Sequence, residues 1–136
     1  MELKDGIYSL IGVDEVEVPT GWYDYNGETS DGIAICLDGV TYVAYADPDD
    51  GYRSYGCFEP SNIEIHNTFP PQKVRLTNIE WDGCDEDGWR SAGSIIKLSN
   101  PTDNSTILEV GTDHSDSYYP YSIFSWHPEN LPINKK

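Results

Sequence analysis

Short runs of apolar and β-branched residues, separated by turn residues, dominate this sequence. No window of eleven or more residues keeps apolar positions at the helical spacing i, i+3, i+4 and i+7 without a glycine or proline interrupting it. The runs span residues 6–11, 15–18, 33–37, 40–46, 63–65, 73–79, 94–98, 106–110 and 121–126. This pattern predicts an all-β or β-rich fold with little helix, either a compact sandwich or a partly open barrel.

The clearest local element is a hairpin centred on Asp38 and Gly39. An Asp-Gly pair suits a two-residue type I′ turn, in which both central residues need a positive φ. The register that follows pairs Leu37 with Val40, Cys36 with Thr41, Ile35 with Tyr42, Ala34 with Val43 and Ile33 with Ala44. Both faces of this hairpin are largely apolar, so we expect the hairpin to lie in the middle of the fold.

A second hairpin is predicted from residues 94–98 through a turn at 100–104 to residues 106–110. The chain of 136 residues shows no repeat, low-complexity tract or linker, so we expect a single domain. We expect that β-rich domain to span residues 1–132 and residues 133–136 to form a frayed tail.

Charge narrows the range of functions. The 24 Asp and Glu residues outnumber the 8 Lys and Arg residues, which gives a formal net charge of −16. This balance argues against direct binding of nucleic acid or of an anionic membrane through a basic surface. The sequence also lacks an apolar run long enough to span a membrane, a signal peptide, and a paired cysteine motif. We therefore expect a cytoplasmic protein.

The acidic residues gather at predicted turns, where their carboxylates should project into solvent. Aromatic residues accompany two of these clusters, and tyrosine and tryptophan can stack on arginine and anchor a protein contact. These two clusters form the predicted partner-binding surface: Asp47, Asp49, Asp50 and Tyr52 in the first, and Trp81, Asp82, Asp85, Glu86, Asp87 and Trp89 in the second.

Such a surface can imitate a nucleic acid. Duplex DNA carries about one charge per 1.7 Å, so sixteen charges correspond to roughly eight base pairs, a length on the order of 27 Å. The sequence therefore predicts a non-enzymatic protein that blocks a basic surface on a nucleic-acid-binding or defence protein. A plain solvated acidic surface is the competing interpretation. The sequence does not decide between a monomer and a homodimer.

Other functions remain open at this stage. The tryptophans and tyrosines could form a platform for a small ligand or carbohydrate, and an immunity or antitoxin protein would use the same acidic surface against one basic toxin. Neither acidic loop has the spacing of the helix-loop-helix calcium site, which leaves only an irregular Ca²⁺ site. We predict no cofactor. The Ser, His and Asp residues of 113–117 lie side by side in sequence, which favours a polar turn over a catalytic triad.

Three segments carry a resemblance to small uncharacterised proteins of phages and prophages. They are residues 47–55 (DPDDGYRSY), 67–71 (NTFPP) and 110–120 (VGTDHSDSYYP). The resemblance covers about a fifth of the chain and transfers no functional residue. It implies a phage setting, in which small acidic proteins include inhibitors of host defence. A phage-encoded protein of this kind would act in the cytoplasm of the host cell.

Overall fold

Strands make up most of the structure. A computed structural model describes residues 3–19, 29–47, 53–55, 58–115 and 121–134. Its strands are β1 (Gly6–Pro19), β2 (Thr29–Leu37), β3 (Val40–Asp47), β4 (Arg53–Tyr55), β5 (Glu59–Pro60), β6 (Thr68–Cys84), β7 (Arg90–Ser99), β8 (Thr106–Asp113) and β9 (Tyr121–Trp126). Two short 3₁₀ helices follow, η2 (Pro128–Asn130) and η3 (Pro132–Asn134). The all-β prediction is confirmed.

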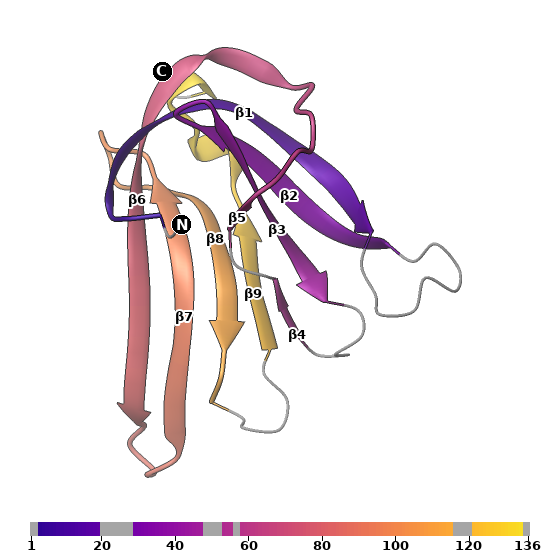
Figure 1. Cartoon of the computed structure of the whole chain (residues 1–136). Coiled ribbons are helices and arrows are strands. Elements are labelled where there is room, and N and C mark those ends of the chain that lie inside the picture. The colour runs from indigo at the N-terminus through magenta and orange to yellow at the C-terminus, as the bar shows by residue number, and fades with distance from the viewer. Residues whose placement is uncertain (1–2, 20–28, 48–52, 56–57, 116–120, 135–136) are drawn as a thin grey trace.

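The strands form one antiparallel sheet in the order β4-β3-β2-β1-β6-β7-β8-β9, with β5 paired to β3. The sheet curls until β4 lies beside β8 and β9 (Figure 1). No ladder joins β4 to β9 within the described residues, so the curled sheet stays open on that side. Of the two arrangements that the sequence predicted, a sandwich or a partly open barrel, the structure agrees with the partly open one.

The β2–β3 hairpin has the predicted register, pair for pair, from Leu37↔Val40 to Ile33↔Ala44. Asp38 and Gly39 have φ values of 52° and 86°, as a type I′ turn requires. Both faces of the hairpin are buried, because Ile33 and Ile35 face the main core while Ala34 and Val43 lie on the opposite side. The β7–β8 hairpin also follows its prediction.

The main core fills the concave side of the curled sheet. One row of leucines crosses three neighbouring strands, since Leu76 pairs with Leu98 and Leu98 pairs with Leu108. All three are almost fully buried. The remaining members of this core are Leu10, Val13, Ile33, Ile35, Leu37, Tyr42, Ala44, Phe58, Val74, Ile107, Val110 and Leu131.

The predicted run at residues 63–65 does not form a strand, and the segment that contains it passes close to a bulge in β1. The register of β1 shifts between Leu10 and Gly12 against both of its neighbours. A Cβ at Gly12 would lie 2.7 Å from the backbone oxygen of Asn67, so only glycine allows the chain to cross so closely. Ile63 and Ile65 pack instead on the outer cluster formed by Ala34 and Val43.

Strand β6 is longer than the apolar run at 73–79 that predicted it. It begins before Pro70 and Pro71, which lie where β6 has no partner on β7, because that ladder starts at Arg75. A proline without an N–H is tolerated at such a one-sided position. At its other end, β6 continues through polar residues to Cys84.

The C-terminal residues that the sequence placed in a frayed tail are partly ordered. Ile133 and Asn134 lie in η3, and the backbone N–H of Ile133 donates a 2.7 Å hydrogen bond to the side-chain oxygen of Gln72. Lys135 and Lys136 lie outside the described residues. In the part of the chain described, no helix has the length and apolar character needed to cross a membrane.

Candidate functional site

The β6–β7 hairpin projects beyond the rest of the sheet. Its ladder runs as far as Cys84↔Arg90. The neighbouring ladders end earlier, since β1 pairs with β6 only as far as Leu76, and β8 pairs with β7 only from Gly93. Figure 1 shows the resulting two-stranded ribbon extending past the other strand ends. The second predicted cluster, residues 81–89, lies on this ribbon and its turn.

The turn that closes the ribbon is built around Asp85. Its Oδ1 accepts hydrogen bonds from the backbone N–H groups of Asp87 and Trp89, each at 2.9 Å. Its own N–H donates to the backbone oxygen of Trp89 at 2.8 Å. Gly88 has a φ of 86°, a conformation that glycine adopts without strain. Asp85 therefore holds the turn, and its carboxylate is already used by the protein itself.

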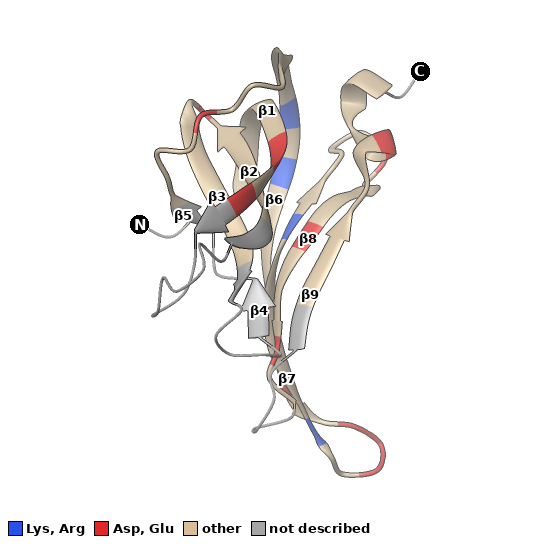
Figure 2. Cartoon of the chain, turned by 90° about the vertical axis from the view of Figure 1, so that its right-hand side faces the viewer, with Lys and Arg blue, Asp and Glu red and all other residues tan. Residues whose placement is uncertain are grey.

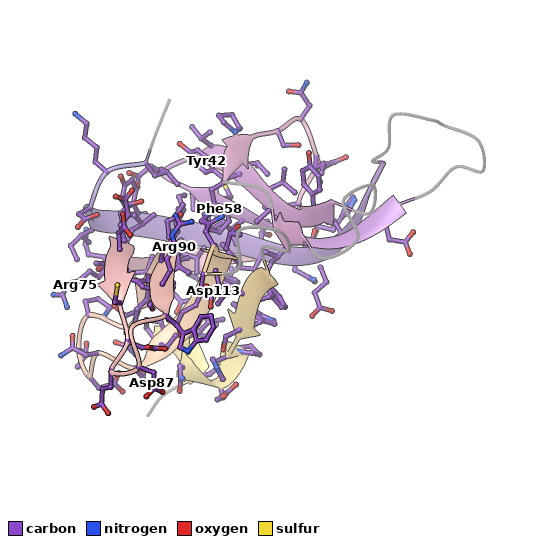
Figure 3. All side chains as sticks on the ribbon, turned by 90° about the horizontal axis from the view of Figure 1, so that it is seen from below. Tyr42, Phe58, Arg75, Asp87, Arg90 and Asp113 are labelled. Carbon is purple, nitrogen blue, oxygen red and sulfur yellow. The ribbon has the colours of Figure 1, made fainter. Side chains whose placement is uncertain are left out.

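Three other predicted carboxylates point into solvent at the tip of the ribbon. Asp82, Glu86 and Asp87 are all exposed. Figure 2 shows the turn as an acidic loop beyond the end of the sheet, and Figure 3, viewed from below, places Asp87 at the periphery of the molecule. Residues 82–89 are called the hairpin tip from here on. Because Asp82, Glu86 and Asp87 lie close together in the hairpin tip, negative charge is concentrated where the ribbon protrudes from the sheet.

Sequence reasoning missed one member of this acidic group. Glu80 is exposed and lies two residues before Asp82 on β6, so the two side chains share one face of the ribbon. The prediction ended the strand at Ile79 and began the acidic cluster at Trp81. Continuing the period-two alternation one residue beyond Ile79 would have found Glu80.

The two tryptophans of this cluster occupy different environments. Trp81 is half-buried, and its indole ring lies against Gly93, its partner across the β6–β7 ladder. Trp89 is 73% exposed at the hairpin tip. Trp81 therefore serves packing within the sheet, whereas the ring of Trp89 is available to a partner.

Of the first predicted cluster, the structure describes only the backbone of Asp47, which lies apart from the β6–β7 ribbon. Asp47 is the last residue of β3, while Asp49, Asp50 and Tyr52 lie outside the described residues. Strands β2 and β1 separate β3 from β6 in the sheet. Figure 1 also shows the end of β3 apart from the end of the β6–β7 ribbon.

Of the polar segment predicted at 113–117, the structure describes Asp113, the last residue of β8, with His114 and Ser115, while 116 and 117 lie outside the described residues. The Oδ1 of Asp113 accepts from the backbone N–H of Ser115 at 2.8 Å, and hydrogen bonds from the Ser115 side chain and backbone hold the pKa of Asp113 below its usual value. The Ser115 hydroxyl contacts the backbone of Ala92, and His114 is exposed. Within the described part of the chain, no three His, Cys, Asp or Glu side chains are grouped so as to hold a metal ion.

Comparison with known proteins gives no relative. No protein-family model, curated protein or solved structure matches the chain.

Proposed function

We propose that this protein binds and blocks a basic surface on a nucleic-acid-binding protein, with the hairpin tip as the contacting element. The observation that carries the proposal is the projection of Asp82, Glu86 and Asp87 beyond the sheet, together with the exposed ring of Trp89. Because the acidic hairpin tip projects beyond the sheet, it can enter a groove of the partner that normally receives a phosphate backbone.

The two residue types at the tip have separate roles. Carboxylates attract a basic surface over a distance and raise the rate of encounter. An aromatic ring that becomes buried on contact supplies an anchor, and it can also stack on an arginine guanidinium. Asp85 contributes through the turn, because its hydrogen bonds fix the position of Asp87 and Trp89.

The finer form of the proposal is mimicry of DNA by a phage-encoded antagonist of a host defence protein. It is supported by the net charge of −16 and by the acidic ribbon. In this form, duplex DNA and the hairpin tip compete for the same lysine and arginine side chains on the partner.

The test compares two variants that carry the same change in net charge. The first, Asp82→Asn with Glu86→Gln and Asp87→Asn, neutralises the tip and leaves Asp85 in place. The second, Glu15→Gln with Glu17→Gln and Glu64→Gln, neutralises three exposed carboxylates on β1 and the segment that follows β5. Each tagged protein is used to capture partners from a bacterial lysate, washed at low and then high salt, and the eluates are identified by mass spectrometry.

The expected result is one nucleic-acid-binding protein, captured by the wild type and by the control variant, lost with the tip variant, and released by salt or by duplex DNA. Equal loss in both variants would show that net charge alone causes the capture. Capture that duplex DNA does not displace would contradict mimicry. Recovery of no such protein would contradict the proposed function.

A carbohydrate or small-ligand module is the second candidate, and Trp89 is the observation that favours it. It is the only tryptophan among the described ones that is exposed, since Trp81 and Trp126 are half-buried. Flat stacking of a sugar on Trp89 would depend on its ring and would be insensitive to neutralising Asp82, Glu86 and Asp87. A glycan-binding screen with wild type and Trp89→Ala separates the two functions.

A further inference from the structure

The end of β9 carries a serine, a histidine and a glutamate joined in one chain of hydrogen bonds. The Oγ of Ser125 lies 2.6 Å from Nε2 of His127. The Nδ1 of the same ring lies 3.2 Å from Oε1 of Glu129. Both ring nitrogens are therefore occupied, one by a hydroxyl and the other by a carboxylate. This is the order of contacts that links nucleophile, base and orienting acid in acyl-transfer sites.

The backbone holds each of the three residues in place. Ser125 pairs with Glu109 across the β8–β9 ladder, and the N–H of His127 extends that ladder with a 2.7 Å hydrogen bond to Ile107. Glu129 lies in η2, directly after the strand.

Two contacts tie η2 to the body of the protein. The side-chain amide of Asn130 donates to the backbone oxygen of Thr106 at 2.6 Å, and Leu131 is buried in the core. The arrangement therefore belongs to the folded sheet and not to a free tail.

The chemistry of the three groups fixes the direction of the hydrogen bonds. An ionised carboxylate can only accept, so the proton between His127 and Glu129 belongs to Nδ1. A neutral imidazole has one N–H, which leaves the lone pair of Nε2 to accept from the hydroxyl of Ser125. A neutral His127 ring beside an ionised Glu129 is therefore in the tautomer that can take the proton of Ser125.

We propose that Ser125 is a reactive nucleophile that attacks neutral carboxylic esters, with His127 as its general base and Glu129 as the residue that positions the ring. Oγ bonds to the carbonyl carbon while its proton passes to Nε2. The ester C–O bond then breaks, and the leaving alcohol takes that proton. Water attacks the acyl-serine, gives one proton to His127, and releases the carboxylic acid as Ser125 recovers its proton.

The register also supplies a donor beside the serine. Because His127 and Ile107 form a hydrogen-bonded pair, the alternation of an antiparallel ladder directs the N–H of Trp126 away from β8. The amide after a nucleophile commonly donates to the oxyanion of the tetrahedral intermediate.

Neighbouring charges select the substrate class. Glu109 lies opposite Ser125 on the same face of the sheet, with Lys97 one strand further, and Glu129 lies on the other side of the histidine. Two carboxylates near the nucleophile repel anionic esters, so the site accepts uncharged ones. The His127 side chain is 42% exposed, which opens the site to small solutes.

Labelling of the full chain with a fluorophosphonate tests the nucleophile. Oγ displaces fluoride from phosphorus, and mass spectrometry locates the adduct. We expect the adduct on Ser125 and a fall in labelling rate of about 100-fold or more in His127→Gln, the usual scale of general-base assistance. Ser105 is the internal control, because its hydroxyl contacts the carboxylate of Asp103 at 2.6 Å and no histidine.

Labelling of Ser125 no faster than that of Ser105, or a rate unchanged in His127→Gln, would overturn the proposal. The Glu15→Gln, Glu17→Gln, Glu64→Gln variant should label at the wild-type rate, because these exposed carboxylates have no part in either site. Hydrolysis of p-nitrophenyl acetate then measures turnover, with Ser125→Ala lowering it and His114→Gln, an exposed histidine elsewhere, leaving it unchanged.

Glu129 needs a readout that a merely structural role would not change. Its side chain is 67% exposed, so Glu129→Gln should fold normally. The variant should label more slowly and shift the ¹⁵N resonances of His127 away from the Nδ1–H tautomer. Slower labelling with unchanged ring resonances would refute the positioning role.

Discussion

The backbone N–H of His66 donates a 2.6 Å hydrogen bond to Oδ2 of Asp14, a residue 52 positions earlier in the chain. The other oxygen of this carboxylate accepts from the N–H of Asn67 at 3.1 Å. Asp14 is only 8% exposed, so it is a buried acid whose two oxygens are both used by backbone donors. It ties the segment that follows β5 to β1 beside the bulge at Gly12.

Replacing Asp14 should destabilise the fold. In Asp14→Ala, the backbone N–H groups of His66 and Asn67 lose a charged acceptor, and a hydrogen bond to a charged group contributes about 1.5–3 kcal/mol. The free energy of unfolding, measured with urea, should fall by that amount. Glu17→Ala, an exposed acid on the same strand, should change it by less than about 0.5 kcal/mol. Equal effects of the two variants would contradict the proposed role of Asp14.

Gly93 should not accept a side chain. An added Cβ would overlap the ring of Trp81 and lie 2.7 Å from the backbone oxygen of Thr112. We expect Gly93→Ala to cost about 1–3 kcal/mol through overpacking. Gly83→Ala is the matched control on the same hairpin, because nothing lies within 4 Å of its added Cβ. Urea unfolding followed by tryptophan fluorescence compares them, and a Gly93→Ala protein as stable as Gly83→Ala would refute the packing argument.

Gly39 tests the turn that the sequence predicted. Its φ of 86° is strained for any residue with a Cβ, so Gly39→Ala should lower the free energy of unfolding by about 1 kcal/mol. Gly6→Ala provides the comparison, since Gly6 has open space around it and no positive φ. A loss of similar size at both positions would show that general strand effects, not the turn conformation, account for the change.

The parts of the fold that the sequence predicted are those that local chemistry determines. Asp38 and Gly39 specify a turn, and the turn specifies the register of β2 and β3. The contact between Asp14 and His66 depends on a crossing of distant segments, which no local pattern indicates. The length of β6 was underestimated because prolines interrupt the apolar pattern at its first end and acidic residues interrupt it at the other. Each end of β6 tolerates these residues because a neighbouring strand is missing on one side.

In the candidate sites, too, some features follow from the local sequence and others depend on how distant segments are arranged. The acidic turn at 85–88 was visible in the sequence as a local cluster, whereas its projection depends on where β1 and β8 stop pairing. Ser125, His127 and Glu129 are close in sequence, but their contact requires the chain to leave β9 and enter η2 at Pro128. The constellation visible in the sequence lies at residues 113–117, where Ser115, its described serine, instead contacts the backbone of Ala92.

Acid should weaken the attachment of the N-terminal residues to β6. The Oδ1 of Asp5 accepts from the backbone N–H of Asn78 at 2.8 Å and from its side-chain amide at 2.9 Å. The backbone hydrogen bond, and then the side-chain one, hold the pKa of Asp5 below its usual value of 3.8. A carboxyl with a lowered pKa in the folded state stabilises the protein above its unfolded pKa, and this contribution is lost as the pH falls through the folded value.

The stability of the wild type should therefore decline more steeply below pH 3.8 than that of Asp5→Asn, which has no carboxyl to protonate at this position. At neutral pH, the wild type should be the more stable of the two. Urea unfolding at a series of pH values measures both proteins. Asp113 has a lowered pKa of its own and remains in both, so the difference between the two curves isolates Asp5. Curves that stay parallel throughout the acid range would show that the hydrogen bonds from Asn78 do not favour the ionised form of Asp5.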